Sequence, residues 1–136
     1  MEKTRVNISS GSKFEEAFGY SRAVKAGDTV YVSGTIGMDY AAGAMSKDPV
    51  AQLHQIIRNF EPALTKAGAT LKDVVQITTY VTAPEVFQTI GPELGNIFAH
   101  IRPTNAALVV AFPVPDVKVE ISAIAVIGCG VSGRST

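Results

Sequence analysis

Glu120 is the side chain in this sequence whose type and position most favour chemistry. Its carboxylate lies in an otherwise largely apolar segment, VKVEISAIAVI (117–127). A carboxylate in a partly dry environment can have a raised pKa, and it can then orient water and transfer protons near neutral pH. The alternative is a solvated glutamate that pairs with a cation on a neighbouring strand and does no chemistry. The segment by itself leaves both interpretations open.

The segment that carries Glu120 alternates like a β-strand. One face is apolar throughout, and the other changes from polar to apolar along the strand. The preceding segment, 107–112, is apolar on both faces, which favours burial against another subunit. Glu120 is therefore expected where a core meets solvent, a subunit interface or a pocket.

Other motifs that resemble chemical sites lack the necessary context. Cys129 is the single cysteine, with no CxxC or Cys/His cluster around it, so the sequence offers no basis for a disulfide or a metal site. The GxGxxG pattern at 128–133 is not followed by the helix and acidic residue that a dinucleotide site requires. We expect 128–136 to be a flexible tail, and we expect no metal and no cofactor.

The composition excludes several classes of partner. The 136 residues are enough for one domain with its own core, which we place at 1–127. Twelve basic and twelve acidic residues give zero formal charge, so there is no excess of positive charge to bind nucleic acid. No apolar stretch is long enough to span a bilayer, and no signal peptide is recognisable. We expect a cytoplasmic protein that binds neither nucleic acid nor membranes.

One helix is predicted with clear start and stop signals. Asp48 is a favoured N-cap, and Pro49 is well tolerated at the first helical position. Apolar residues then recur at helical spacing until Gly68, which is a typical C-terminal stop. Pro62 lies inside this segment and is expected to bend the helix.

A second helix is predicted to begin at Thr82, where TAPE (82–85) matches a capping box. It is expected to kink or break near Ile90, because Gly91 and Pro92 follow.

The remaining pattern is that of strands and loops. Segments 3–8, 21–24, 29–33 and 74–81 are rich in β-branched residues or alternate in polarity, and 9–20 is expected to be a long loop. Because helices separate strands that also pair as hairpins, we predict an α+β fold, a mixed sheet with both helices on one face.

Four segments, in this order and at these separations, resemble the Rid (YjgF-type) enamine/imine deaminase family. They are GYSRAV (19–24), VSG (32–34), AGATLKDVV (67–75) and VEISAIA (119–125). The resemblance extends over 19–127. It implies a chorismate-mutase-like α+β domain with a six-stranded sheet, assembled as a homotrimer with ligand clefts between subunits.

The resemblance also implies an activity. Deaminating members hydrolyse a small 2-imino or enamine acid to a 2-keto acid and ammonia without metal or cofactor. Tyr20 falls on the family's cleft tyrosine, and Ser33 and Gly34 fall on backbone that lines the cleft. Glu120 falls on the carboxylate that positions water. These assignments agree with the needs of water addition to a C=N carbon.

Asn105 departs from the family pattern. Deaminating members hold the substrate carboxylate with an arginine in a Pro-x-Arg stretch, and PTN (103–105) places Asn105 there. Loss of a charge-assisted clamp would weaken carboxylate binding by about 2 to 5 kcal/mol. Gly91 also replaces a common asparagine. Arg102 and Arg22 are candidates for the missing cation, although each is otherwise interpreted as an exposed arginine.

Three functions follow as alternatives. The first is a cofactor-independent deaminase that acts on a small enamine, imine or related carbonyl compound different from the usual substrate. The second is a non-catalytic, small-molecule-binding or regulatory trimer, which Asn105 and Gly91 favour. The third is the ribonuclease or translation-inhibitor activity assigned to some members, which the neutral charge and two histidines do not support.

Overall fold

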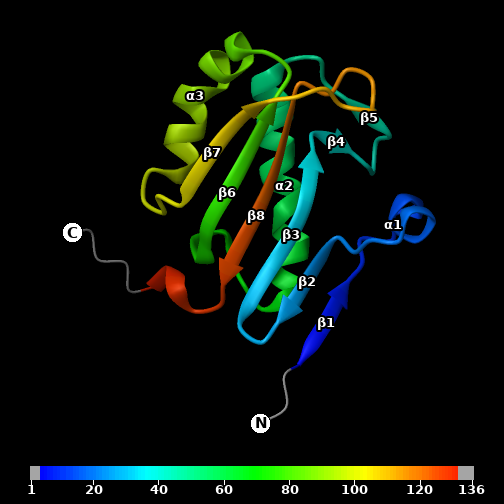
Figure 1. The fold of residues 1–136 in the computed structure, drawn as a ribbon, viewed down its shortest axis with the longest axis vertical. Helices are drawn as coiled ribbons and strands as arrows, with labels where there is room; N and C mark the ends of the chain where they lie inside the picture. Colours follow the sequence, from blue (N-terminus) through cyan, green and yellow to red (C-terminus); the bar gives the residue numbers. More distant parts are fainter. Residues whose placement is uncertain (1–3, 132–136) are drawn as a thin grey trace.

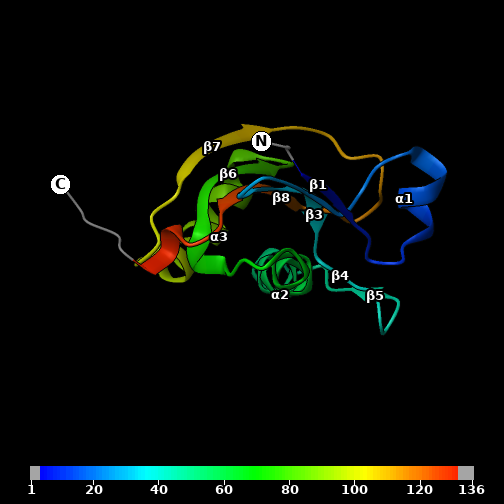
Figure 2. The same cartoon turned by 90° about the horizontal axis from the view of Figure 1, so that it is seen from below.

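A mixed six-stranded sheet with two long helices on one face forms the body of the protein (Figure 1), and Figure 2 shows the two layers from below. The computed structural model describes residues 4–131. The strand order is β1 (Arg5–Ile8), β2 (Ala23–Ala26), β3 (Thr29–Ile36), β8 (Val119–Val126), β6 (Val74–Val81) and β7 (Thr104–Val109). Strands β6 and β7 pair in parallel, and the other neighbours pair antiparallel. The predicted α+β fold is confirmed.

Helix α2 (Pro49–Ala67) forms where the sequence predicts it. The side chain of Asp48 accepts a hydrogen bond from the Ala51 amide, and Gly68 ends the helix with a left-handed φ of 84°. The helix continues through Pro62. Its apolar stripe is fully buried against the sheet, at Leu53, Ile56, Phe60 and Leu64. This burial explains why the helix lies flat across the strands.

Helix α3 (Pro84–Phe98) differs from the prediction at its start and in its middle. Ala83 is the N-cap and makes no side-chain capping bond, so the predicted start at Thr82 with a capping box is wrong. The predicted break near Ile90 is also wrong, because α3 runs continuously through Pro92. Ile90, Leu94 and Phe98 are buried, and this packing outweighs the hydrogen bond that a proline removes.

A short helix, α1 (Lys13–Phe18), replaces part of the loop predicted for 9–20. Ser12 caps it by accepting a hydrogen bond from the Phe14 amide, and Gly19 ends it with a φ of 70°. Phe14 and Phe18 stack with their ring centroids 6.2 Å apart, although both rings are exposed. The helix protrudes from the margin of the sheet (Figure 1).

The first residues of the predicted tail contact the body of the protein. A 3₁₀ turn, η2 (Cys129–Val131), lies beside a second turn, η1 (Leu71–Asp73), and the Gly130 amide donates to Asp73 Oδ1 at 2.9 Å. Residues 132–136 lie outside the described part of the chain. Among the described residues, no helix is both long and apolar enough to cross a membrane.

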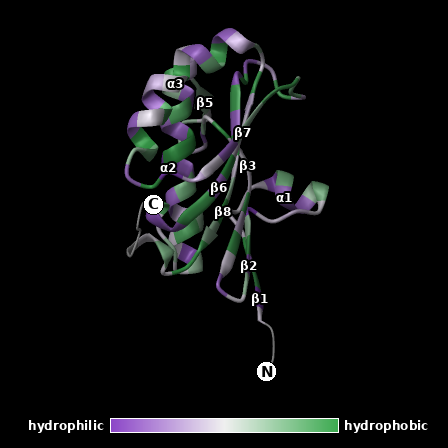
Figure 3. Cartoon of the chain, turned by 60° about the vertical axis from the view of Figure 1, so that its left-hand side comes forward, coloured by the Kyte–Doolittle hydropathy of each residue, from purple (hydrophilic) through white to green (hydrophobic). Residues whose placement is uncertain are grey.

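The sheet face opposite the two long helices carries exposed apolar side chains. Figure 3 shows α2 and α3 together on one side of the sheet. On the strands, Tyr31 is 50% exposed and Leu108 is 45% exposed, and all six residues of β7 are exposed. This exposed apolar surface agrees with the expectation that a further subunit covers the sheet. The trimer itself stays a prediction.

Candidate functional site

A bulge in β3 brings Gly34 against the carboxylate of Glu120. Val32 pairs with Ala123 and Thr35 pairs with Ile121, so β3 has one more residue than β8 between these pairs. A Cβ at Gly34 would lie 2.8 Å from Glu120 Oε1. A side chain at this position would displace the Glu120 carboxylate, so glycine permits the carboxylate to pack against the bulged backbone.

Hydrogen bonds around the bulge hold its shape. Ser33 Oγ donates to the Ser21 carbonyl at 2.6 Å, and Thr35 Oγ1 donates to the Ser33 carbonyl at 2.8 Å. From helix α2, the amide group of Asn59 donates to the carbonyls of Ile36 and Met38, at 3.1 and 2.9 Å. Both ends of the bulged segment are thus fixed to neighbouring elements.

Glu120 is half-buried on the outer face of central strand β8. Burial raises the pKa of its carboxyl above the ordinary value, and the positive charge of Arg22 partly offsets that rise. The two effects together favour a carboxylate that exchanges protons more readily than a solvated glutamate does. This environment differs from the simple solvated strand residue that was the alternative.

Arg22 is buried next to this carboxylate and is not the exposed arginine of the alternative interpretation. It is 9% exposed, and its Nη2 donates to the Gly34 carbonyl at 2.8 Å. Among residues 4–131, no carboxylate lies within 4.0 Å of the guanidinium. Arg22 therefore fixes the backbone beside Glu120 and influences that carboxyl through space.

Two tyrosines, Tyr20 and Tyr40, belong to the same group of side chains as Glu120. Burial raises the pKa of Tyr40; the charge of Arg22 acts in the opposite direction, and Tyr20, Glu15 and Glu120 add to the rise. All four groups therefore lie within electrostatic reach of the Tyr40 hydroxyl. We call Tyr20, Arg22, Gly34, Tyr40 and Glu120 the Glu120 group.

Glu15, on α1, lies outside this group but within electrostatic reach of Tyr40. It is 5% exposed and accepts hydrogen bonds from both the amide and the hydroxyl of Ser10. Burial alone would raise its pKa, but the hydrogen bonds from Ser10 and Ser9 and the charge of Arg22 outweigh burial and lower it. Glu15 and Tyr40 were not recognised from the sequence, because both lie in segments without helical or strand periodicity.

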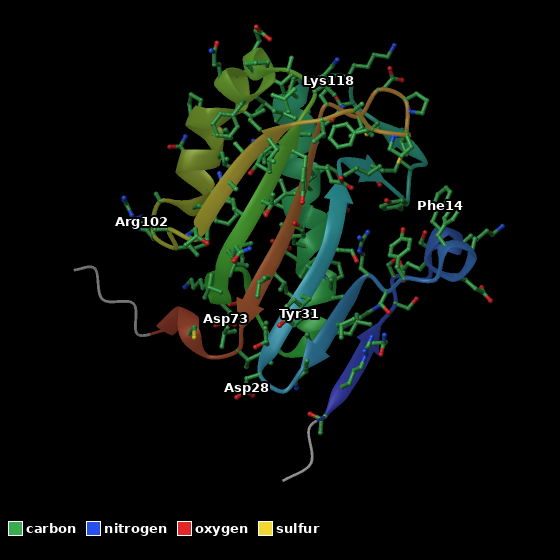
Figure 4. The ribbon with its side chains drawn as sticks, in the orientation of Figure 1. Phe14, Asp28, Tyr31, Asp73, Arg102 and Lys118 are labelled. Carbon is green, nitrogen blue, oxygen red and sulfur yellow. The ribbon has the colours of Figure 1, made fainter. Side chains whose placement is uncertain are left out.

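Asn105, Arg102 and Gly91 gather in a different place. They line an open hollow of about 470 Å³ between α3 and β7, which we call the β7 hollow. Asn105 Oδ1 accepts a hydrogen bond from Thr79 Oγ1 at 3.1 Å. Arg102 is exposed just after the end of α3, with a φ of 53°. Figure 4 shows it near the edge of the sheet opposite to the edge at which α1 and Phe14 lie.

Within one chain, the Glu120 side chain and the β7 hollow lie on opposite faces of the sheet. Glu120 pairs with Tyr80, and Ile121 pairs with Thr79. Because side chains alternate along a strand, the buried Thr79 and its partner Asn105 face the helices, whereas Glu120 faces away from them. The structure brings together Tyr20, Arg22, Ser33, Gly34 and Glu120, and it places Arg102 and Asn105 elsewhere.

Comparisons with known sequences give a consistent family. A family model described as endoribonuclease L-PSP matches residues 11–127. A 2-iminobutanoate/2-iminopropanoate deaminase of Rattus norvegicus is 36% identical over 123 residues, which cover 89% of this chain and 90% of the relative. A RutC family protein of Pyrococcus abyssi is 33% identical over 107 residues, covering 78% and 84%.

Solved structures agree with the sequence comparisons. A Mycobacterium tuberculosis member of the YjgF/YER057c/UK114 family has a TM-score of 0.81 and 41% identity, and the match covers 91% of this chain and 100% of that one. The YjgF gene product of E. coli has a TM-score of 0.73 and 27% identity, covering 89% and 92%.

Proposed function

Because this chain belongs to the YjgF or Rid family, whose family model is described as endoribonuclease L-PSP, we propose that it is a cofactor-independent hydrolytic deaminase. Its substrate is a small imine, enamine or related carbonyl compound. The single observation that carries the proposal is the half-buried Glu120 carboxylate with a raised pKa, packed against Gly34. The similarity to 2-iminobutanoate/2-iminopropanoate deaminases supports the choice of reaction.

The proposed reaction is the addition of water to a C=N carbon. Glu120 in its ionised form accepts a proton from water while the water oxygen bonds to the imine carbon. The protonated carboxyl returns that proton to the nitrogen, which gives a tetrahedral intermediate with one hydroxyl and one amino group. Glu120 then transfers the hydroxyl proton to the amino nitrogen as the C–N bond breaks, so that ammonia departs and a carbonyl product remains. Arg22 supports this cycle because it keeps the pKa of the buried carboxyl from rising further.

The remaining residues of the Glu120 group are proposed to hold the substrate. Tyr20 is 42% exposed and, like Glu120, lies within electrostatic reach of Tyr40, so its ring is proposed to contact a small ligand bound near this group. The Gly34 carbonyl is occupied by Arg22, and the lack of a side chain at Gly34 lets the Glu120 carboxylate pack against the backbone. Ser33 acts indirectly, because its hydroxyl is already bonded to the Ser21 carbonyl.

We propose that the complete cleft is shared between subunits of a homotrimer. One wall is the Glu120 group, and the other is the β7 hollow of an adjoining subunit, with Asn105 and Arg102. The exposed outer face of the sheet and the fully exposed β7 support this assembly. A shared cleft accounts for the placement of the two groups on opposite faces of one chain.

Asn105 implies that the substrate differs from a simple 2-imino acid. An amide in place of an arginine lacks the charge and the forked geometry that bind a carboxylate. Arg102 lines the same hollow, but its exposure to solvent weakens any pairing that it makes. A neutral substrate, or one whose carboxylate binds elsewhere, is therefore favoured. A binding or regulatory trimer remains the second proposal, because Asn105 and Gly91 both depart from the deaminase pattern.

The test uses 2-iminopropanoate generated in situ, with release of keto acid as the readout. We expect slow release by the natural chain, faster release by Asn105→Arg, and none above background by Glu120→Ala. Glu61→Ala, an exposed carboxylate on α2, is the matched control and should behave like the natural chain. Equal inertness of the natural chain and Asn105→Arg would contradict the deaminase and favour the binding role.

A further inference from the structure

A separate cavity of about 180 Å³ lies at the margin of the sheet, on the other side of Arg22 from Gly34. The end of β1, Tyr40 and two turns of α2 enclose it. Its polar lining residues are Ser9, Ser10, Arg22, Tyr40, Asn59 and Lys66. The volume suits an organic acid of a few carbon atoms and is much smaller than a pocket for a drug-sized ligand.

The lining of this cavity is cationic. Arg22 and Lys66 both border it, and none of its lining residues is a carboxylate. Lys66 comes from α2, and its Nζ donates to the Ser9 carbonyl at 3.0 Å, which holds the ammonium at the wall. The charges of Glu15 and Glu120 interact with Arg22 through space, but among residues 4–131 neither carboxylate lines the cavity or lies within 4.0 Å of the guanidinium. Two cations that line a cavity without a carboxylate in its wall attract a negatively charged ligand.

The guanidinium of Arg22 has fewer partners than its burial requires. It is more than nine-tenths buried, yet one hydrogen bond is found for it in the described chain, from Nη2 to the Gly34 carbonyl. Its Nε has no acceptor among residues 4–131. A buried guanidinium with five N–H donors is stable only when acceptors or a counter-charge compensate for lost hydration. The Nε–H of Arg22 is therefore a buried donor for which residues 4–131 supply no acceptor.

We propose that this cavity binds a small carboxylate between Arg22 and Lys66. A carboxylate matches the planar fork of an arginine, and a lysine that lines the same cavity adds a second charge-assisted bond. The choice of carboxylate rests on the proposed function, whose substrate or keto-acid product supplies one. The carboxylate is either part of the substrate, which compensates for Asn105, or a free ion that occupies the cavity beside the reaction site.

The binding test is direct and needs no turnover. Sodium acetate and sodium pyruvate are titrated into the ¹⁵N-labelled protein, with acetamide as the neutral control, and amide shifts are followed. We expect saturable shifts at Ser9, Ser10 and Lys66 with both anions and none with acetamide. Shifts confined to the β7 hollow, or no saturable shifts at all, would overturn the proposal and leave water as the occupant of the cavity.

Substitutions identify the two cations. Arg22→Gln should weaken carboxylate binding by about ten-fold to a hundred-fold, and Lys66→Gln by about three-fold to ten-fold. Arg58→Gln is the matched control, because Arg58 is an exposed cation of the same helix that bonds to Gln55. Since Arg22 is buried and its loss can disturb folding, the conservative Arg22→Lys and the substitution of exposed Lys66 in Lys66→Gln provide independent results. Unchanged affinity in Lys66→Gln together with Arg22→Lys would refute the site.

Two further measurements separate the sources of the carboxylate. If the cavity holds the substrate's carboxylate, acetate should inhibit competitively and Lys66→Gln should raise KM with little change in kcat. If it holds a free ion, acetate should bind equally well in the presence of saturating substrate. Glu120→Ala should retain acetate binding in both cases. A natural chain that binds acetate but releases no keto acid would refute the deaminase and leave the carboxylate site intact.

Discussion

The Glu120 group and the β7 hollow belong to the same sheet but differ in how firmly the fold holds them. Glu120 lies on β8, which pairs with strands on both sides, and a bulge and a buried arginine fix the backbone beside it. Asn105 lies on β7, the edge strand, where all six residues are exposed. A central strand therefore carries the preorganised group, and the edge strand carries an open one.

This contrast indicates that the two regions have different functions. Fixed groups with shifted pKa values suit proton transfer, because they need little rearrangement when charge moves. An open hollow at a sheet edge suits a contact that is completed by another subunit or by the ligand. We expect substitutions in the Glu120 group to change the chemistry and substitutions in the β7 hollow to change binding.

The largest expected difference between the regions comes from adding bulk at one glycine in each. Gly34→Val should lower deaminase activity by about a hundred-fold, because its side chain would displace the Glu120 carboxylate. Gly91→Ala should stay within about two-fold of the natural chain, since nothing lies within 4 Å of the added Cβ. Steady-state kcat/KM for both variants, with circular dichroism to confirm folding, measures the difference. Similar losses of kcat/KM in the two variants would contradict the proposal that the Glu120 group performs the chemistry and the β7 hollow contributes to binding.

Mixed subunits test whether the two regions meet across an interface. A Glu120→Ala chain and a Gly95→Trp chain, in which the β7 hollow is blocked, should each be inactive alone. Refolded together, they should recover a measurable fraction of activity, because some interfaces then combine an intact Glu120 group with an intact hollow. Light scattering should show three chains in each sample. Activity that stays at the level of the separate variants would exclude the shared cleft.

The acid side of the pH profile should move when the charge beside Glu120 is removed. Arg22 lowers the pKa of Glu120 against the stronger effect of burial, so Arg22→Gln should raise that pKa. Because the ionised carboxylate is the reactive form, activity should then begin to fall at a higher pH as the solution is acidified. Arg102→Gln, in the β7 hollow, should not change the pH at which activity begins to fall. A profile of kcat/KM against pH for the three proteins provides the measurement.

The smallest expected effects are on stability. Ser10→Ala removes the hydrogen bond from the Ser10 hydroxyl to buried Glu15 and keeps the one from the backbone amide. It should lower the free energy of unfolding by about 1 to 3 kcal/mol at neutral pH. Glu15 has a lowered pKa, so its contribution is present above its unfolded pKa and is lost as the pH falls through its folded value. The difference from the natural chain should therefore shrink in acid.

A neutral hydrogen bond in the β7 hollow provides the comparison. Thr79→Val removes the bond to Asn105 and should cost about 1 kcal/mol, with little dependence on pH. Urea unfolding at several pH values separates the two variants. A pH-independent loss in Ser10→Ala would contradict the assigned role of Glu15.

Several elements were predictable because their signals are local and repeated. Helix α2 follows from its cap, its apolar stripe and Gly68, and β8 follows from strict alternation. Helix α1 was missed because six residues are too few for a periodic signal. The cap at Ser12 and the stacking of Phe14 on Phe18 produce no repeated pattern along the sequence. The break expected in α3 does not occur, because tertiary packing stabilises the turn around Pro92.

The sequence by itself determined the fold class and the family, and it indicated Glu120 as the candidate acid, because periodicity and ordered segments can be recognised along the chain. Only the tertiary structure decided that Arg22 is buried beside Gly34, that Tyr40 belongs to the Glu120 group, and that Asn105 faces away from Glu120. The physical reason is distance along the chain. These relations depend on a strand bulge and on side chains from separate elements, which packing alone brings together.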